Sequence, residues 1–191
     1  MEALLISIGI VALAEIGDKT QLLALVLAAR FRRPWPIVLG ILVATLANHT
    51  LAGAVGVWLT TLLSPLVLRW LLGLSFLAMA AWMLVPDRID EDEAVPLARG
   101  AFVTTLVAFF LAEMADKTQV ATVALAAQFQ SVWLVVAGTT LGMMIANVPV
   151  VLLGERMARR MPVRLVHGMA AALFALLGLA TLLGVGEWLG F

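Results

Sequence analysis

The chain has 191 residues, of which 63% are apolar and 13% are charged, and its formal net charge is zero. A soluble domain carries charges on about a quarter of its residues, so this composition excludes a water-soluble protein. The balanced charge argues against nucleic acid as a partner, and the absence of cysteine excludes disulfides and thiolate metal sites.

Six apolar stretches are long enough to cross a bilayer, which takes about 20 helical residues. Charged or proline-containing segments separate them, and none has the alternating pattern of a strand. The sequence therefore predicts an all-α membrane protein with six transmembrane helices. In chain order, we expect these spans at residues 3–29, 37–62, 66–85, 101–127, 132–154 and 165–186.

The first span ends its apolar run with an A-x-A pattern at residues 12–14, which is also typical of a signal peptide. Two features favour a membrane helix instead. The segment before the run contains Glu2 and no basic residue, and its Leu-Ala-Glu sequence recurs inside the chain at residues 111–113.

The chain is an internal duplication. Residues 12–31 align without a gap with residues 110–129, an offset of 98, and 11 of the 20 positions are identical. Each copy holds three spans, an odd number, so the second copy must enter the membrane in the opposite sense. This is the inverted repeat of many secondary transporters. We expect repeat 1 at residues 1–86, an acidic cytoplasmic linker at 87–98, and repeat 2 at 99–191.

Arginine placement predicts the orientation in the membrane. Cytoplasmic loops collect Lys and Arg, and the connections after spans 1, 3 and 5 are rich in arginine, whereas the opposite side has only Arg69. Both termini are therefore predicted outside, on the periplasmic side of a bacterial inner membrane. The arginines of the predicted cytoplasmic side are Arg30, Arg32, Arg33, Arg88, Arg99, Arg156, Arg159, Arg160 and Arg164.

Each repeat carries one copy of an acidic motif near the middle of its first span, at residues 15–21 (EIGDKTQ) and 113–119 (EMADKTQ). An ionisable group at the bilayer centre costs about 2.5–3.5 kcal/mol on insertion scales, so these groups need a compensating role. On a continuous helix, the Glu, Asp and Lys of each motif share one face, the glutamine flanks it, and the threonine lies further round. In an inverted repeat the two faces can meet at the midplane.

Such a site suits a hard divalent cation. Carboxylate and amide oxygens without cysteine favour Mg²⁺, Ca²⁺ or Mn²⁺. Four carboxylates and two lysines leave a charge of −2, which one divalent cation or two protons would neutralise. Because crowded carboxylates titrate as a coupled set, the site could exchange the cation for protons.

Polar side chains in neighbouring positions are candidates for further ligands or for a proton relay, with hydrogen bonding between helices as the alternative role. These residues are Gln21, Gln119, Asn48, His49 and Asn147. The two repeats place His49 and Asn147 at equivalent positions. His167, near the start of the sixth span, is expected at the membrane interface rather than among the ligands.

Small residues at a spacing of four indicate close helix packing in the second and fifth spans. They are Gly40 with Ala44, and Gly138 with Gly142.

The motifs admit two other roles. Ion pairs within one helix, Glu15 with Lys19 and Glu113 with Lys117, would neutralise buried charge but leave both aspartates uncompensated. An intramembrane aspartyl protease also carries a Gly-Asp pair like residues 17–18, but the second copy has Ala-Asp and the chain has no tyrosine. We therefore expect no enzymatic activity.

The doubled E-x-G-D-[KR]-[TS] motif on spans 1 and 4 of a six-span chain resembles the Gdt/MneA-type family of cation transporters, which comprises Golgi manganese/calcium–proton exchangers and bacterial manganese exporters. The resemblance covers essentially the whole chain. It implies export of Mn²⁺ or Ca²⁺ from the cytosol against H⁺, with the metal as substrate rather than cofactor. The ligands it implies are Glu15, Asp18, Glu113 and Asp116, and the charge balance above assigns the neutralising role to Lys19 and Lys117.

The sequence departs from this pattern at Ala115, where the motif has glycine. We expect this alanine to stiffen the second copy's helix. The alternatives that stay open are Ca²⁺ instead of Mn²⁺, a cationic amino acid, an uncoupled cation channel, and a scaffold that transports nothing. The acidic linker is expected to be a solvated tether, with cation sensing as its alternative role.

Overall fold

The structure is a computed structural model that describes residues 1–85, 100–114, 116–154 and 162–185. All regular secondary structure in these ranges is helical, and four of the helices, α3, α4, α7 and α9, are long and apolar enough to cross a membrane. The predicted all-α membrane class is confirmed. The helices are α1 (Glu2–Glu15), α2 (Lys19–Phe31), α3 (Pro34–Leu62), α4 (Pro65–Met83), α5 (Ala101–Ala112), α6 (Lys117–Phe129), α7 (Val132–Leu153) and α9 (Val163–Leu182).

The first and fourth expected spans are each broken into two helices. α1 ends at Glu15 and α2 begins at Lys19, while α5 ends at Ala112 and α6 begins at Lys117. The prediction of continuous helices with Glu, Asp and Lys on one face is therefore wrong. So is the expectation of a stiffer second copy, because its helix breaks at the same place. Ala115 itself lies outside the described residues.

Local chemistry accounts for the breaks. Gly17 has φ +84°, a conformation that glycine adopts without steric cost. Asp18 and Asp116 both have extended backbone immediately before the next helix, a position that aspartate favours. In a membrane, such irregular backbone is tolerated only where protein buries it or where it lines a cavity.

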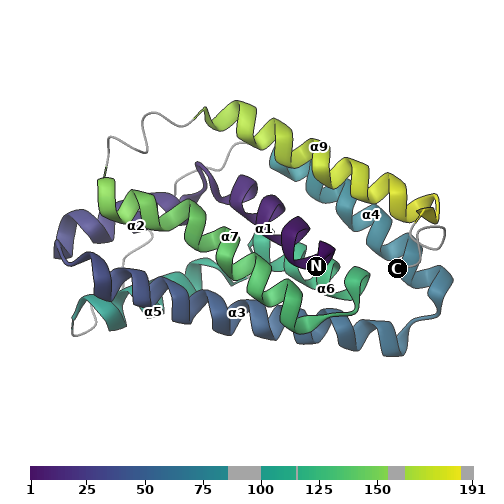
Figure 1. Cartoon of the computed structure of the whole chain (residues 1–191), viewed down its shortest axis with the longest axis horizontal. Helices are drawn as coiled ribbons and strands as arrows, with labels where there is room; N and C mark the ends of the chain where they lie inside the picture. Colours follow the sequence, from purple (N-terminus) through teal and green to yellow (C-terminus); the bar gives the residue numbers. More distant parts are fainter. Residues whose placement is uncertain (86–99, 115, 155–161, 186–191) are drawn as a thin grey trace.

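Figure 1 shows how the two halves are arranged. α1 and α2 run along the long axis in one direction, and α5 and α6 run in the other. α3 and α7 pack against each other in the middle and against the broken helices, with α1 on α7 and α5 and α6 on α3. α4 and α9 form a pair along one side.

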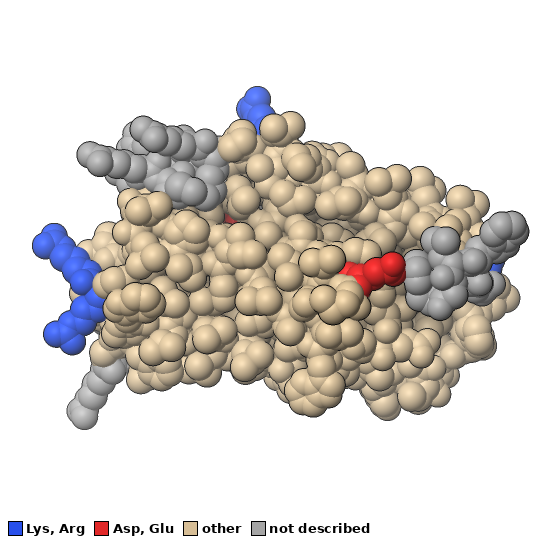
Figure 2. All heavy atoms as spheres, in the orientation of Figure 1, with Lys and Arg blue, Asp and Glu red and all other residues tan. Residues whose placement is uncertain are grey.

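Three helix ends beside the connections predicted to be cytoplasmic lie together. The turn between α2 and α3, the start of α5 and the end of α7 lie at the left end of the view in Figure 1. Basic side chains stand out at this end in Figure 2, whereas the middle of the visible face is almost without charge. The acidic linker lies outside the described residues, as do Arg88, Arg99, Arg156, Arg159 and Arg160.

Glycines allow the central helices to approach the broken helices closely. A Cβ on Gly138 would lie 2.6 Å from the Leu4 carbonyl oxygen and 2.7 Å from the Ser7 Cβ. A Cβ on Gly40 would lie 2.8 Å from the Cβ of Thr105. Since Gly40 and Gly138 are equivalent in the repeats, as are Ser7 and Thr105, these are the same contact made twice. The predicted packing role of both glycines is confirmed.

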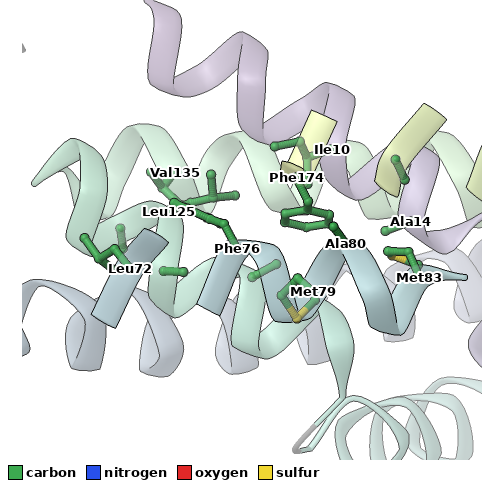
Figure 3. Close-up of a cluster of buried hydrophobic side chains, with 14 of the residues drawn as sticks. Ile10, Ala14, Leu72, Phe76, Met79, Ala80, Met83, Leu125, Val135 and Phe174 are labelled. Carbon is green, nitrogen blue, oxygen red and sulfur yellow. The ribbon is translucent and has the colours of Figure 1, made fainter. Parts of the chain in front are cut away.

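The α4–α9 pair is joined to the rest of the molecule by a buried apolar cluster. The rings of Phe76 and Phe174 are stacked with their centroids 6.3 Å apart, and they occupy equivalent positions in the two repeats. Figure 3 shows these rings beside Ile10 of α1 and Leu125 of α6. The cluster therefore holds the pair against the helices that lie on one side of the two breaks.

Candidate metal site at the two helix breaks

Three carboxylates from the two motifs meet between the helix breaks. Glu15 is the last residue of α1, Glu113 follows α5 directly, and Asp116 precedes α6. Both glutamates are 0% exposed and Asp116 is 6% exposed. One carboxylate oxygen from each of the three lies within 4.8 Å of the other two. The repeats thus contribute jointly to one acidic group.

The motif lysines form ion pairs across the repeats. Lys19 Nζ lies 3.6 Å from Asp116 Oδ1, and Lys117 Nζ lies 3.9 Å from Asp18 Oδ1. The two ion pairs join residues at equivalent positions of the two repeats. Each lysine thus pairs with the aspartate of the other repeat, an arrangement that the sequence did not predict. It balances the aspartates and leaves the glutamates as the remaining negative charge.

The motif threonines contact the glutamates, which the sequence did not predict. Thr20 Oγ1 donates a hydrogen bond of 2.6 Å to Glu15 Oε2, and Thr118 Oγ1 donates one of 3.2 Å to Glu113 Oε2. On a continuous helix these side chains would point apart, but the break brings the first turn of the second helix back to the glutamate. The signal available in the sequence was the recurrence of threonine at the same spacing in both copies.

Gln21 connects the first break to α7. Its Oε1 accepts a hydrogen bond of 3.0 Å from the Gly17 backbone N–H, and its Nε2 donates one of 3.0 Å to the Ala146 carbonyl. Gln119, the equivalent residue, is partly exposed. The structure thus gives Gln21 a role in holding the break in place.

Asn48, His49 and Asn147 are all buried in the middle of α3 and α7. Asn48 Nδ2 donates a hydrogen bond of 3.0 Å to the Phe110 carbonyl of α5, and Asn147 Nδ2 donates one of 3.1 Å to the Met143 carbonyl of its own helix. His49 Nε2 lies 3.9 Å from Glu113 Oε2. Of these three residues, His49 is the one that the structure places directly against the acidic group.

Several buried polar atoms around the breaks lack a hydrogen-bond partner among the described residues. They are Glu15 Oε1, Glu113 Oε1, Asn48 Oδ1, Asn147 Oδ1 and both ring nitrogens of His49. Leaving one such group unsatisfied costs about 1–3 kcal/mol. All of them can coordinate a cation, either as oxygen donors or as imidazole nitrogen.

His167 lies against the first break. Its Nε2 is 2.8 Å from the Ile16 carbonyl oxygen, and its side chain is largely buried. Val163, one turn earlier on α9, is the side chain that a Cβ on Gly17 would meet. The start of α9 therefore covers the interrupted backbone of repeat 1.

Buried carboxylates held between interrupted helices, in a chain with an apolar surface, are typical of a secondary transporter for cations. A family model described as the divalent cation/proton antiporter GDT1 matches residues 3–91 and 101–188. The chain belongs to this family, as the doubled motif predicted. It is therefore a multi-pass membrane transport protein, and the family is not a class of enzymes.

Two relatives extend this assignment. A Vibrio cholerae serotype O1 protein named "Putative manganese exporter" is 54% identical over 183 residues, which are 95% of this chain and 90% of the relative. A GDT1-like protein of Synechocystis is 31% identical over 188 residues, 87% of this chain and 91% of the relative. No solved structure matches the chain.

Proposed function

We propose that the protein exports Mn²⁺ from the cytosol across a bacterial inner membrane in exchange for H⁺. The ion would be held by Glu15, Glu113 and Asp116, whose oxygens lie within 4.8 Å of one another. This group carries the proposal, because an ion with bonds of about 2.2 Å has opposing ligands about 4.4 Å apart. A modest contraction would bring all three carboxylates onto one ion.

Asp18 is proposed as the fourth acidic ligand, used in a different conformation. It is the repeat equivalent of Asp116 and is buried to a similar degree, at 2% and 6% exposure. Alternating access between inverted repeats exchanges the environments of equivalent residues. Asp18 would therefore replace Asp116 beside the glutamates when the site faces the other side of the membrane.

The proposed topology has six crossings in two inverted repeats, with both termini outside. Two observations support it. α1–α2 and α5–α6 run in opposite directions, and the α2–α3 turn, the start of α5 and the end of α7 lie at an end that carries basic side chains. In this topology the two breaks meet near the midplane, where transporters of this kind bind their ions.

Proton exchange is proposed from the charge of the site. With each aspartate paired to a lysine, two glutamates remain, and either one divalent cation or two protons would neutralise them. The amides at Gln21, Gln119, Asn48 and Asn147 would then support the ligands or relay protons. A cationic amino acid is a weaker candidate, because the lysines that could bind its carboxylate are engaged with aspartates.

Metal tolerance tests the substrate and the site together. Cells lacking their own manganese exporter would express the wild type, Asp18→Asn or Glu2→Gln and be challenged with Mn²⁺ and, separately, with Ca²⁺. We expect the wild type and the Glu2→Gln control, an exposed acid outside the site, to restore growth in Mn²⁺. Asp18→Asn should not restore it at equal membrane levels. Failure of the wild type to restore growth would favour a scaffold and overturn the proposed export, and rescue by Asp18→Asn would remove Asp18 from the proposed ligands.

Proteoliposomes containing a pH-sensitive dye test the coupling. Imposing a Mn²⁺ gradient on vesicles with the wild-type protein should drive protons in the opposite direction. Metal flux that is insensitive to the pH gradient would favour an uncoupled channel.

A further inference from the structure

The acidic residues of the motif are the same in both repeats, but the buried polar residue at the equivalent position of the middle helix is not. α3 carries His49 where α7 carries Asn147. The site therefore has access to one imidazole nitrogen, from one repeat only. Carboxylates alone do not distinguish Mn²⁺ from Ca²⁺, since both ions accept hard oxygen ligands.

His49 is placed as a ligand would be. Its side chain is 0% exposed, and Nε2 lies 3.9 Å from Glu113 Oε2. Two atoms that bind the same ion at about 2.1 Å each lie roughly 3–4.2 Å apart, depending on the angle between them. An ion can therefore contact both atoms without a large movement of either side chain.

A packing role alone accounts poorly for this histidine. Buried polar side chains are nearly always hydrogen-bonded, yet both ring nitrogens of His49 lack a hydrogen-bond partner among the described residues. Asn147, at the equivalent position, satisfies its Nδ2 through the Met143 carbonyl. The imidazole instead has an acidic oxygen in front of Nε2, at a distance too long for a hydrogen bond.

We propose that His49 is a metal ligand and makes the site selective for divalent first-row transition ions over Ca²⁺ and Mg²⁺. This inference rests on the proposed export of Mn²⁺ and adds a residue that determines specificity. Ca²⁺ and Mg²⁺ take oxygen ligands, whereas imidazole nitrogen binds transition ions. The same nitrogen binds ions later in the series more strongly than Mn²⁺, so Co²⁺ and Zn²⁺ should compete with Mn²⁺.

Pulsed electron paramagnetic resonance of bound Mn²⁺ tests this ligand directly, because it detects coordinated imidazole nitrogen. The full-length protein would be purified with a tag that contains no histidine. The chain has two histidines, so His167→Asn is a matched control for His49→Asn. We expect nitrogen modulation in the wild type and in His167→Asn, and its loss in His49→Asn. A wild-type spectrum without nitrogen, or one that persists in His49→Asn, would overturn the inference.

Competition binding provides the second measurement. The ratio of the Ca²⁺ to the Mn²⁺ dissociation constant should fall by about tenfold or more in His49→Asn and His49→Gln. An equal loss of affinity for both ions would show that His49 only supports the fold. If the proposed function itself fails, the wild-type protein will bind no Mn²⁺, or its Mn²⁺ binding will be unchanged in Glu113→Gln. That result differs from Mn²⁺ that binds at the site without a nitrogen ligand. If His49→Asn folds poorly, nitrogen modulation in His167→Asn still assigns the ligand, because His49 is then the remaining histidine of the sequence.

Discussion

Hydroxyl groups at the two breaks orient the carboxylates that form the centre of the site. Thr20 and Thr118 each donate a hydrogen bond to the glutamate of their own motif, and all four side chains are buried. A hydrogen bond to a charged acceptor contributes about 1.5–3 kcal/mol. One oxygen of each glutamate is thus held by a hydroxyl, while the other lacks a hydrogen-bond partner among the described residues.

Removing the first of these hydroxyls should weaken metal binding. In Thr20→Val the side chain keeps its shape but Glu15 Oε2 loses its donor, so we expect Mn²⁺ affinity to fall about tenfold. Thr20→Ser keeps the donor and should stay within about twofold of the wild type. Isothermal titration of the purified protein measures both. Equal affinities for the valine and serine variants would contradict this role of the hydroxyl.

The charge of the site also depends on pairings that cross between repeats. Lys19 pairs with Asp116 and Lys117 with Asp18, but Lys19 is 32% exposed at its side chain whereas Lys117 is 3% exposed. The two repeats therefore carry the same residues in different environments. A transporter built from two inverted repeats is expected to have this difference in exposure when its site is open to one side of the membrane.

At the level of the helices, two different requirements meet in α1 and α5. Each must end at the motif so that its glutamate reaches the acidic group, and each must also lie close to a central helix along its length. Glycines on the central helices meet the second requirement, with Gly138 against α1 and Gly40 against α5. The broken helices are thereby held by backbone contact rather than by long side chains.

A methyl group at this contact should destabilise the protein. In Gly138→Ala, the new Cβ would lie 2.6 Å from the Leu4 carbonyl oxygen, and overpacking of this kind costs about 1–3 kcal/mol. Gly9→Ala on α1 is the control, because a Cβ there meets no atom within 4 Å in the described part of the chain and alanine favours the helix by about 0.5–1 kcal/mol. Thermal unfolding in detergent should show a lower midpoint for Gly138→Ala alone. A loss of the same size in both variants would rule out the close contact as the cause.

Across the whole molecule, the repeats are equivalent in sequence but not in their packing. A Cβ on Gly56 of α3 would overlap the Val123 carbonyl oxygen of α6, whereas one on its equivalent, Gly154 at the end of α7, meets no atom of the described residues within 4 Å. α3 and α6 are therefore in tight contact at a point where α7 and α2 are not. The α4–α9 pair likewise packs on α1 and α6, which lie on the same side of the breaks.

The orientation of the whole molecule can be tested by labelling. The chain has no cysteine, so single cysteines report without background. A membrane-impermeant thiol reagent should label Glu2→Cys in intact cells and Arg33→Cys only after the inner membrane is opened. Both positions are exposed in the structure. Labelling of Arg33→Cys in intact cells would reverse the proposed orientation.

The sequence by itself determined the membrane class, the limits of the spans around α3, α4, α7 and α9, the duplication, and the motif that supplies the acidic group. These features depend on the length of apolar runs and on residues that are close together along the chain, and both can be read directly from the sequence. It also located the motif glycine and aspartate but assigned them to a continuous helix, because a long apolar run outweighed the local preference of both residues for a break.

Only the tertiary structure decided which side chains meet. The ion pairs of Lys19 with Asp116 and Lys117 with Asp18, and the position of His49 against Glu113, join residues that are far apart along the chain. Such pairings depend on how the two repeats dock, and that is set by close contacts between helices such as the one at Gly138. The physical reason is that docking geometry sums many small packing terms over the whole molecule, whereas helix formation and membrane burial are decided segment by segment.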